Sequence, residues 1–379
     1  MKNYHYIFTG TGLSALMTVY KMVLSGNFSD KTMLLIDEDP KNTNDRTWCY
    51  WEEPKGKWDK IVTMKWNSAL FANENFHRDL DLQPYQYKMI KGLDFYNKIF
   101  KKLSKESNIT ILNQKVTGYS ESANGVVVQT TEGDFSCEKL FNSIYDPAQL
   151  LAQEKYPLLQ QHFIGWFIKS KQLVFNPNQL TFMDFSVQQK GNTRFMYVLP
   201  TSNSQALIEY TLFSKELLAE EEYEQEIKNY IAKLGITDYE ILEKEQGSIP
   251  MTSFPFWKNN SKNIINIGSA GGWTKASTGF TFRNSDKKSD ALVAFLQTEN
   301  DFTKFYKKNR FWFYDLLLLD ILDKKNKAGS RIFSSLFKKG NTALILKFLD
   351  EETSLFQDIR VILKCPTFLF IQALFKRVF

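Results

Sequence analysis

A glycine-rich turn near the amino terminus constrains the fold more than any other feature of the sequence. An apolar run over residues 4–9 is followed by Gly10, Gly12 and Ala15 in the spacing G-x-G-x-x-A, and then by a helical pattern. In such a strand–turn–helix, the first glycine permits the turn, the second lets the backbone approach a pyrophosphate, and the alanine lets the helix pack closely. The N–H groups and partial positive charge at the helix start suit phosphates. The sequence therefore predicts a dinucleotide site here.

The acidic residue Asp37 strengthens this prediction and narrows the choice of cofactor. It ends a second predicted strand, KTMLLID, roughly twenty residues beyond the start of the helix, where a carboxylate can bind ribose hydroxyls. This carboxylate would repel a 2′-phosphate, so the pattern disfavours NADP at this site and leaves FAD or NAD. A tight turn without a ligand is the structural alternative, and the complete βαβ context argues against it.

A second glycine-rich loop lies far downstream, in INIGSAGGWTKASTGFTF. It follows a predicted strand and precedes a predicted helix. Flavoproteins have two-part sites of this kind, in which a late strand and helix close over the flavin ring, so the pattern favours FAD. Four glycines would let the backbone lie against the cofactor: Gly268, Gly271, Gly272 and Gly279. Alternatively, these glycines only shape the loop.

Composition and charge argue against several other classes of protein. The net charge of +6 comes from lysines spread along the chain. A nucleic-acid-binding protein would instead cluster its basic residues in a stripe or arm. Dispersed positive charge suits weak attraction to an anionic membrane surface. Three separated cysteines and three scattered histidines give no metal-binding spacing and indicate a reduced, cytoplasmic chain. The first apolar run leads into the glycine turn, so no signal peptide is expected. No apolar run reaches the ~18 residues of a membrane span.

The aromatic content has two explanations. Aromatic residues make up 15% of the chain, with 32 phenylalanines. Codon usage in an AT-rich genome would produce this bias, and so would a substrate cavity lined by aromatic side chains. Composition alone leaves both explanations open.

The order of predicted elements indicates an α/β protein with a Rossmann-type FAD-binding domain like that of flavoprotein monooxygenases, an inserted mixed-sheet substrate domain and C-terminal helices. Alternating strands with hairpin turns follow a helical segment in the first half, and further strand-like runs precede a charged helix. The sequence predicts five segments: an FAD-binding βαβ unit and aromatic loop over 1–60, the remainder of the nucleotide domain with part of the substrate region over 61–155, a mixed-sheet substrate domain over 156–255, a return to the FAD domain over 256–300, and a helical, candidate membrane-contacting segment over 301–379.

Four motifs occur in a particular order along the chain. They are NDRTWCYWE at 44–52, YVLPTSNSQALIEYT at 197–211, GSIPMT at 247–252 and GGWTKASTGFTF at 271–282. Together they resemble the bacterial lycopene β-cyclases of the carotenoid pathway and, more distantly, the plant enzymes. The stretches QHFIGW and FMDF are also similar to that family. The resemblance extends from Tyr6 to about Leu296 and, more loosely, over the helical tail; the combination of motifs is what makes it specific.

The resemblance implies an activity, a substrate and cofactors. Members of the family convert the open ψ-ends of lycopene into β-ionone rings, giving γ-carotene and then β-carotene, without net electron transfer. They nevertheless need reduced FAD, with NAD(P)H as the usual electron donor. Because lycopene is insoluble in water, the enzyme is expected to be cytoplasmic and peripheral on the inner face of the cell membrane, with no nucleic-acid partner.

By motif match, LIEYT stands where the family has its acidic cyclase motif, so Glu209 is the predicted catalytic acid/base. Tyr210 stands where many relatives carry a second acidic residue, which puts a paired-carboxylate role in doubt. An alkene is a poor base, so the acid must be protonated and dry, and burial raises the pKa of a glutamic acid. An outward-facing position of Glu209 on an alternating strand is the alternative.

A second acidic segment, FLDEET at 348–353, looks like the plant form of the motif. It lies in the C-terminal helical region and is interpreted as an exposed helical charge cluster.

The aromatic stretch after the first βαβ unit is assigned to a substrate tunnel beside the flavin. Aromatic faces stabilise a cation without trapping it, and an anionic reduced flavin would do so through its charge. Asp45 and Arg46 are expected to fix the loop, with Arg46 as a phosphate or ribose partner. The alternative is that the tryptophans anchor the core between domains. The predicted pocket residues are Trp48, Tyr50, Trp51, Tyr210 and Trp273.

The carboxyl-terminal tail, PTFLFIQALFKRVF, is a candidate for shallow membrane contact, with Lys376 and Arg377 at the lipid headgroups. For the apolar helix at 311–322, packing onto the protein explains the pattern at least as well.

Two other functions remain open. A related FAD-dependent isoprenoid hydroxylase or reductase would consume NAD(P)H in proportion to its product, and a non-catalytic carotenoid- or flavin-binding protein would form no rings.

Overall fold

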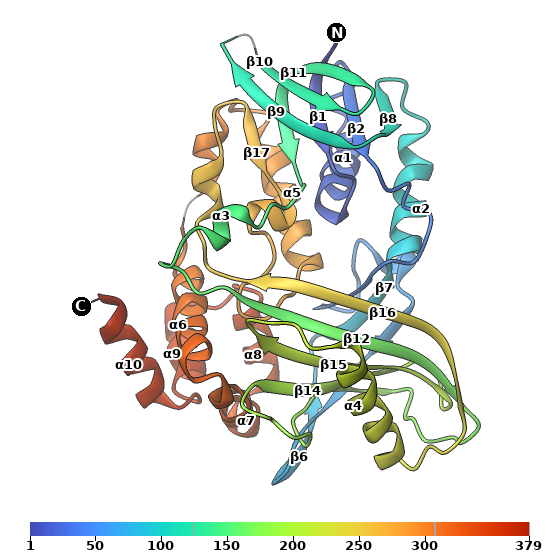
Figure 1. The fold of residues 1–379 in the computed structure, drawn as a ribbon, viewed down its shortest axis with the longest axis vertical. Helices are drawn as coiled ribbons and strands as arrows, with labels where there is room; N and C mark the ends of the chain where they lie inside the picture. The colour runs from blue at the N-terminus through green and yellow to red at the C-terminus, as the bar shows by residue number, and fades with distance from the viewer. Residues whose placement is uncertain (124, 307, 379) are drawn as a thin grey trace.

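The strand–helix–strand unit predicted at the amino terminus lies at the centre of one half of the molecule (Figure 1). The computed structural model describes residues 1–123, 125–306 and 308–378. Strand β1 (Lys2–Thr9) leads through the glycine turn into helix α1 (Leu13–Ser25), and β2 (Met33–Asp37) pairs in parallel with β1. Helix α1 ends at Gly26 in the left-handed conformation, which glycine adopts without strain.

A seven-stranded sheet surrounds this unit, in the order β8-β2-β1-β11-β10-β9 with β17 paired to β11. Five of its strands run parallel, and β9 and β10 add an antiparallel hairpin to β11. Side chains alternate between faces, so Phe8 and Leu35 pack against the helices whereas Ile7 and Leu34 pack toward the hairpin. The remaining elements of this half are α2 (Gly92–Leu103), β8 (Ile109–Asn113), β9 (Val116–Ser122), β10 (Gly125–Thr130), β11 (Gly133–Asn142), β17 (Ile264–Asn266) and α5 (Phe282–Phe295).

A second seven-stranded sheet, in the order β16-β12-β15-β14-β13-β5-β6, forms the opposite half of the molecule (Figure 1). Its strands are antiparallel except for the pair β13–β5. Helix α4 covers one face through Ile227, and the other face packs through Leu207 and Phe213 toward the C-terminal helices. The elements are β5 (Ser68–Asn73), β6 (Phe76–Asp81), β12 (Leu159–Ser170), β13 (Gln179–Asp184), β14 (Thr193–Pro200), β15 (Gln205–Ser214), α4 (Glu220–Lys233) and β16 (Tyr239–Met251).

The aromatic stretch that the sequence assigned to a loop forms a strand from Thr47 onward. Strand β3 (Thr47–Glu52) pairs with β7 (Gln86–Lys91), which also pairs with β4 (Met64–Trp66), in a small antiparallel sheet. Threonine and aromatic residues favour extended backbone, and pairing with β7 satisfies main-chain groups that a buried loop would leave unpaired. The interpretation of this stretch as a loop is therefore corrected.

The chain after α5 is helical, and these helices pack against the second sheet (Figure 1). Helix α6 is buried through Leu316, Leu319 and Leu322, so it packs onto the protein. No helix in the described ranges combines the length and apolarity needed to cross a membrane. The long helices are α6 (Arg310–Lys325), α7 (Gly329–Lys339), α8 (Thr342–Leu349), α9 (Leu355–Ile362) and α10 (Thr367–Val378). Short turns are η1 (Asp59–Ile61), α3 (Ala148–Leu151), η2 (Phe256–Asn259), η3 (Gly268–Gly271), η4 (Phe302–Lys304) and η5 (Asn326–Ala328).

The segment FLDEET is not the exposed charge cluster expected from the sequence. Asp350 is buried just after α8, and its carboxylate lies 3.2 Å from Arg283 Nε and 2.8 Å from Lys287 Nζ, both on α5. Glu351 lies 2.9 Å from the ammonium group of Lys275 in the second glycine loop. These ion pairs join the end of α8 to the segment that follows β17.

Candidate active site

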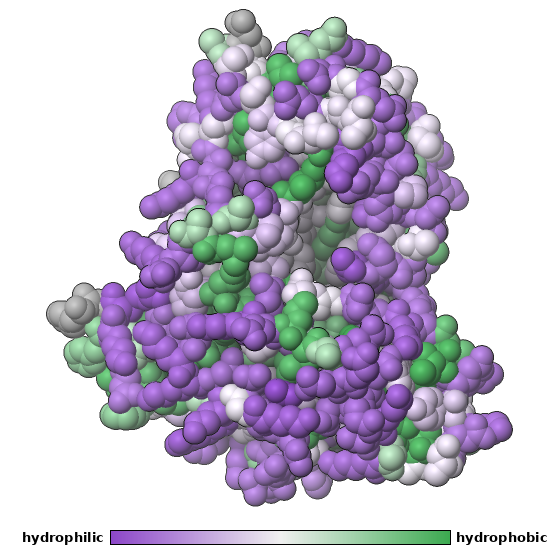
Figure 2. Space-filling view, viewed as in Figure 1, coloured by the Kyte–Doolittle hydropathy of each residue, from purple (hydrophilic) through white to green (hydrophobic). Residues whose placement is uncertain are grey.

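A cavity of about 430 Å³ extends from the start of α1 to the C-terminal helices. Gly12 and Gly268 line one end, and Phe337 and Leu349 line the other. Glu209 contributes to its wall from the second sheet. Figure 2 shows the molecule hollowed between its two halves. The predicted dinucleotide turn and the predicted catalytic acid therefore open onto one cavity.

The first glycine turn leaves room where a pyrophosphate is expected. Gly10 has φ of +82°, and a Cβ there would lie only 2.4 Å from Oγ of Ser143. A Cβ on Gly12 would meet nothing within 4 Å, and no side chain of the described residues caps the start of α1, so its first N–H groups are available to a ligand. Ala15 is fully buried between helix and sheet. These residues fit the diphosphate of a dinucleotide.

The carboxylate of Asp37 is already bound to the turn itself. Its Oδ2 accepts hydrogen bonds from N and Oγ1 of Thr11 at 2.5 and 3.0 Å, and its Oδ1 accepts one from N of Asp39 at 2.9 Å. Asp37 is outside the described cavity lining, whereas Arg46 and Lys41 belong to it. The cations at this end are thus on the loop between β2 and β3, and ribose binding by Asp37 stays a prediction.

The four glycines of the second loop divide into two pairs. Gly268 and Gly279 line the cavity, and a Cβ on Gly268 would lie 3.1 Å from a side-chain oxygen of α1. Gly271 and Gly272 lie away from the described lining. A Cβ on Gly271 would lie 2.1 Å from the carbonyl oxygen of Asn266, and one on Gly272 would lie 2.6 Å from a phenylalanine ring. This second pair shapes the loop, which was the alternative considered from the sequence.

Glu209 lies in the middle of β15, and its side chain faces the cavity. The residue is 7% exposed, and Oγ1 of Thr211 donates a short hydrogen bond to its carboxyl group. Burial and, after it, the nearby charge of Glu245 raise the pKa of Glu209 to about 8, although the bond from Thr211 opposes the shift. An acid that keeps its proton at neutral pH in a dry cavity can protonate a weak base.

A second carboxyl group, Glu245 on β16, lines the same cavity and was missed from the sequence. Glu209 and Glu245 pair with Gly165 of β12 from its two sides. Burial raises the pKa of Glu245 to about 7, and the hydrogen bond from Thr47 lowers it. One signal was available, since Glu245 stands two residues before the GSIPMT motif. The alternating, charged stretch that carries it was not recognised as a strand.

Tyr210 faces away from the cavity, because neighbouring residues of a strand point to opposite faces. It is fully buried on the α4 side of the sheet, where its ring meets that of Tyr223 edge to face. Arg194 donates a hydrogen bond of 3.2 Å to its hydroxyl group. The assignment of Tyr210 to the pocket is therefore corrected: it belongs to the core beneath α4.

The other aromatic residues assigned to the pocket also occupy different positions. Among the described residues, Trp48 lines the cavity but Tyr50, Trp51 and Trp273 do not. Trp51 is buried behind the wall, in edge-to-face contact with Phe280 at 4.7 Å between ring centroids. Tyr50 and Trp273 are buried in the core around α1. The stretch thus contributes one ring to the cavity and supports its wall with the others.

The part of the cavity around Glu209 is apolar. The hydroxyl groups of Tyr87 and Tyr197 bond to each other at 2.7 Å, and burial raises the pKa of both phenols and of the Cys49 thiol, so all three stay neutral. The described residues include no group of three metal-ligating side chains that could hold an ion. Eight phenylalanines line the cavity wall: Phe163, Phe182, Phe195, Phe213, Phe280, Phe282, Phe333 and Phe337.

The fold is that of a class of α/β proteins that includes flavin-dependent enzymes. A geranylgeranyl bacteriochlorophyll reductase-like protein from Thermoplasma acidophilum is 11% identical, with a TM-score of 0.60 and 98% of each chain covered. The p-nitrophenol 4-monooxygenase from Pseudomonas putida is 12% identical, with a TM-score of 0.61, covering 100% of this chain and 98% of that one. A flavin-dependent brominase is 11% identical, with a TM-score of 0.55, covering 93% and 99%. These similarities confirm the predicted fold class.

The chain belongs to the lycopene cyclase family. The family model described as "Lycopene cyclase protein" matches residues 6–375, nearly the whole chain. No curated protein matches this sequence. The match confirms the family suggested by the four motifs.

Proposed function

We propose that this member of the family is a lycopene β-cyclase, which closes the ψ-ends of lycopene into β-ionone rings, through γ-carotene to β-carotene, without net redox change. The observation that carries the proposal is the position of Glu209, buried in the wall of the cavity that begins at the dinucleotide turn. The motif match gives Glu209 the acid/base role of the family. This reaction requires a protonated carboxyl group that is shielded from water and lies beside an apolar cavity.

The reaction begins with proton transfer from Glu209 to the terminal alkene of lycopene. This step needs a carboxyl group that is still protonated at neutral pH, and burial raises the pKa of Glu209 to about 8. A tertiary cation forms, a neighbouring double bond attacks it, and loss of a proton leaves the ring. The phenylalanine wall excludes water and stabilises the cation through the ring faces. Neutral Cys49 and Tyr197 offer no charged nucleophile to trap it.

The residues at the other end of the cavity fit FAD. Gly12 and the start of α1 would bind the diphosphate, and Gly268 and Gly279 bring the second loop to the same space. Arg46, which lines the cavity, is the proposed phosphate or ribose partner. When bound in its reduced form, the flavin supplies negative charge that stabilises the cation. NAD(P)H is the proposed electron donor.

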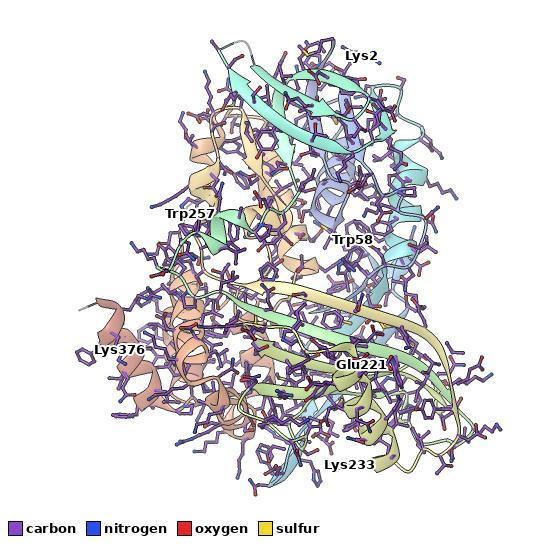
Figure 3. All side chains as sticks on the ribbon, in the orientation of Figure 1. Lys2, Trp58, Glu221, Lys233, Trp257 and Lys376 are labelled. Atoms are coloured by element: carbon purple, nitrogen blue, oxygen red, sulfur yellow. The ribbon has the colours of Figure 1, made fainter. Side chains whose placement is uncertain are left out.

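Membrane contact through α9 and α10 would bring the protein to its water-insoluble substrate. Each helix exposes an apolar stripe, including Phe356 at 83% and Phe368 at 70%. Lys376 lies on α10 at the outer edge of the molecule (Figure 3). Apolar side chains at a membrane surface enter the acyl boundary while basic groups meet the headgroups. Arg377 differs from the expectation, because its Nε is 2.7 Å from Oδ2 of Asp320 and is bound within the protein.

Expression in a lycopene-accumulating bacterium tests the proposal. We expect β-carotene, or γ-carotene if a single end is closed, when the pigments are separated by chromatography. Persistent lycopene in cells that contain folded, flavin-loaded protein would overturn the proposal. With purified protein, consumption of NAD(P)H in proportion to product would indicate an isoprenoid reductase or hydroxylase instead, because a cyclase needs only enough reductant to keep its flavin reduced.

A further inference from the structure

We propose that Glu245 is a second catalytic residue of this site, whose carboxylate takes up the proton that the ring-closing cation loses, while Glu209 supplies the proton that starts the reaction. The inference rests on the proposed function, because it divides one acid/base cycle between two carboxyl groups. The motif match gives Glu245 no role, so the proposal depends on the arrangement of the strands.

The register of the second sheet holds the two carboxyl groups at the same level. Strand β12 runs between β15 and β16, and its Gly165 pairs with Glu209 on one side and Glu245 on the other. A Cβ on Gly165 would lie 3.5 Å from Cβ of Glu209 and 3.3 Å from Cγ of Glu245. Both glutamates line the cavity. One reacting end of a substrate would therefore meet both groups.

The carboxylate of Glu245 is anchored through one oxygen only. Oγ1 of Thr47 donates a hydrogen bond of 2.6 Å to Oε2, and no group of the described ranges donates to Oε1. The charge of Glu243 raises the pKa of Glu245, and the charges of Lys91 and Arg46 lower it. Lys91 pairs with Glu243 at 3.3 Å. Glu245 is therefore held in place, without a salt bridge in the described part of the chain, and with one oxygen left for a proton.

Two carboxyl groups that face one largely apolar cavity do not ionise together easily. Burial raises the pKa of Glu209 to about 8 and that of Glu245 to about 7, and the hydrogen bond from Thr47 counteracts part of the second shift. The charge of Glu245 raises the pKa of Glu209, so the proposal places the shared proton on Glu209 and the negative charge on Glu245. Burial also raises the pKa of the other titratable groups that face the pair, which stay neutral: Cys49, Tyr87 and Tyr197.

The chemistry balances with these two groups alone. The O–H bond of Glu209 breaks and a C–H bond forms at the terminal alkene, which leaves a tertiary cation. The neighbouring double bond forms the new C–C bond of the ring and moves the positive charge to a ring carbon. The adjacent C–H bond then breaks, its electrons form the ring double bond, and its proton goes to Glu245. Return of one proton from Glu245 to Glu209, directly or through solvent between turnovers, restores the starting state.

The test compares Glu245→Gln with Glu209→Gln in deuterium oxide, using flavin-loaded, reduced protein and lycopene. We expect both variants to lose β-ring formation by about 10²- to 10⁴-fold. E245Q still protonates the alkene, so deuterium should enter recovered lycopene or rings with a displaced double bond, whereas E209Q should incorporate none. Wild-type ring formation by E245Q would overturn the proposal, as would loss of rings without deuterium uptake. A wild-type protein that forms no rings would instead overturn the cyclase function.

Glu240→Gln is the matched control, because Glu240 lies on the same strand but is exposed and stands outside the described cavity lining. We expect wild-type ring formation in this variant.

A pH profile covers the case in which E245Q does not fold. Ring formation in the wild type should rise as Glu245 ionises and fall as Glu209 loses its proton. Thr47→Val removes the hydrogen bond that lowers the pKa of Glu245, so the rising limb should move to higher pH. A rising limb at the wild-type position would overturn the proposal.

Discussion

The ammonium group of Lys275, in the second glycine loop, lies 2.8 Å from the carboxylate of Asp315 on α6. Lys275 is 5% exposed, and it also lies 2.9 Å from Glu351 after α8. Its main chain closes the loop, accepting a 2.8 Å hydrogen bond from N of Gly279 and donating a 3.0 Å bond to O of Phe280. Because Gly279 and Phe280 line the cavity, this buried ion pair fixes part of the cavity wall to the C-terminal helices.

Lys275→Met should destabilise the protein strongly, because it leaves Asp315 buried without its partner. Removing one partner of a buried pair costs about 3–5 kcal/mol. Urea unfolding measures the loss, and flavin content should fall with it. Lys304→Met is the control, since the pair of Lys304 with Glu299 is exposed on the lysine side and should contribute at most about 1 kcal/mol. Equal stability of the two variants would contradict the structural role of Lys275.

Glu209→Gln should abolish ring formation without unfolding the protein. Glutamine keeps the size of the side chain and can still accept the hydrogen bond from Thr211, but it has no proton to give to an alkene. Loss of a general acid lowers the rate by about 10²- to 10⁴-fold. Pigment analysis and single-turnover assays measure it. Rings formed at the wild-type rate would remove Glu209 from the catalytic role.

The same substitution should make the protein more stable than the wild type in alkaline solution. The pKa of Glu209 is raised from 4.5 to about 8, so the folded protein retains a proton that the unfolded chain releases above pH 4.5. The contribution of the protonated group is complete below pH 4.5 and is lost as pH rises toward 8, by up to about 1.4 kcal/mol per pH unit. Urea unfolding at several pH values should show E209Q free of this loss. If the free energy of unfolding changed with pH in the same way for the wild type and E209Q, the raised pKa of Glu209 would be contradicted.

Gly12→Val should prevent flavin binding while leaving the fold intact. Gly12 has φ of −73°, which a valine tolerates, and its Cβ would meet no atom within 4 Å. The new side chain would fill the space proposed for the diphosphate. We expect flavin affinity to fall by tenfold or more, at least about 1.4 kcal/mol, with a nearly unchanged melting temperature of the apoprotein. If Gly12→Val bound flavin as fully as the wild type, the diphosphate would have to bind somewhere other than at Gly12.

Replacing Phe356 and Phe368 by serine should weaken binding to lipid vesicles. Each exposed ring would bury apolar area worth about 2 kcal/mol in a membrane surface, so the double variant should bind at least tenfold more weakly in a sedimentation assay. Leu173→Ser is the control, because Leu173 is 76% exposed on the loop between β12 and β13, far along the chain from α9 and α10. Equal losses in both proteins would argue against a specific membrane face.

Local rules predicted the start of the chain but not the sheet that completes the site. Gly10 and Gly12 act within a few residues, so their spacing alone indicates the turn and the helix start. The strand that carries Glu245 alternates in charge rather than in apolarity, and its position depends on pairing with β12, some eighty residues earlier in the chain. Burial of Trp51 likewise depends on the distant Phe280. Contacts between residues so far apart in the sequence leave no periodic pattern in a single chain, so they could not be predicted from it.

The position of Tyr210 separates the two residues of the acidic motif by the thickness of a sheet. In a relative with the same strand register, an acidic residue at this position would extend toward helix α4 rather than into the cavity. Under the proposed function, position 209 meets a chemical requirement and position 210 a packing requirement, so a different amino acid at position 210 should leave the product unchanged.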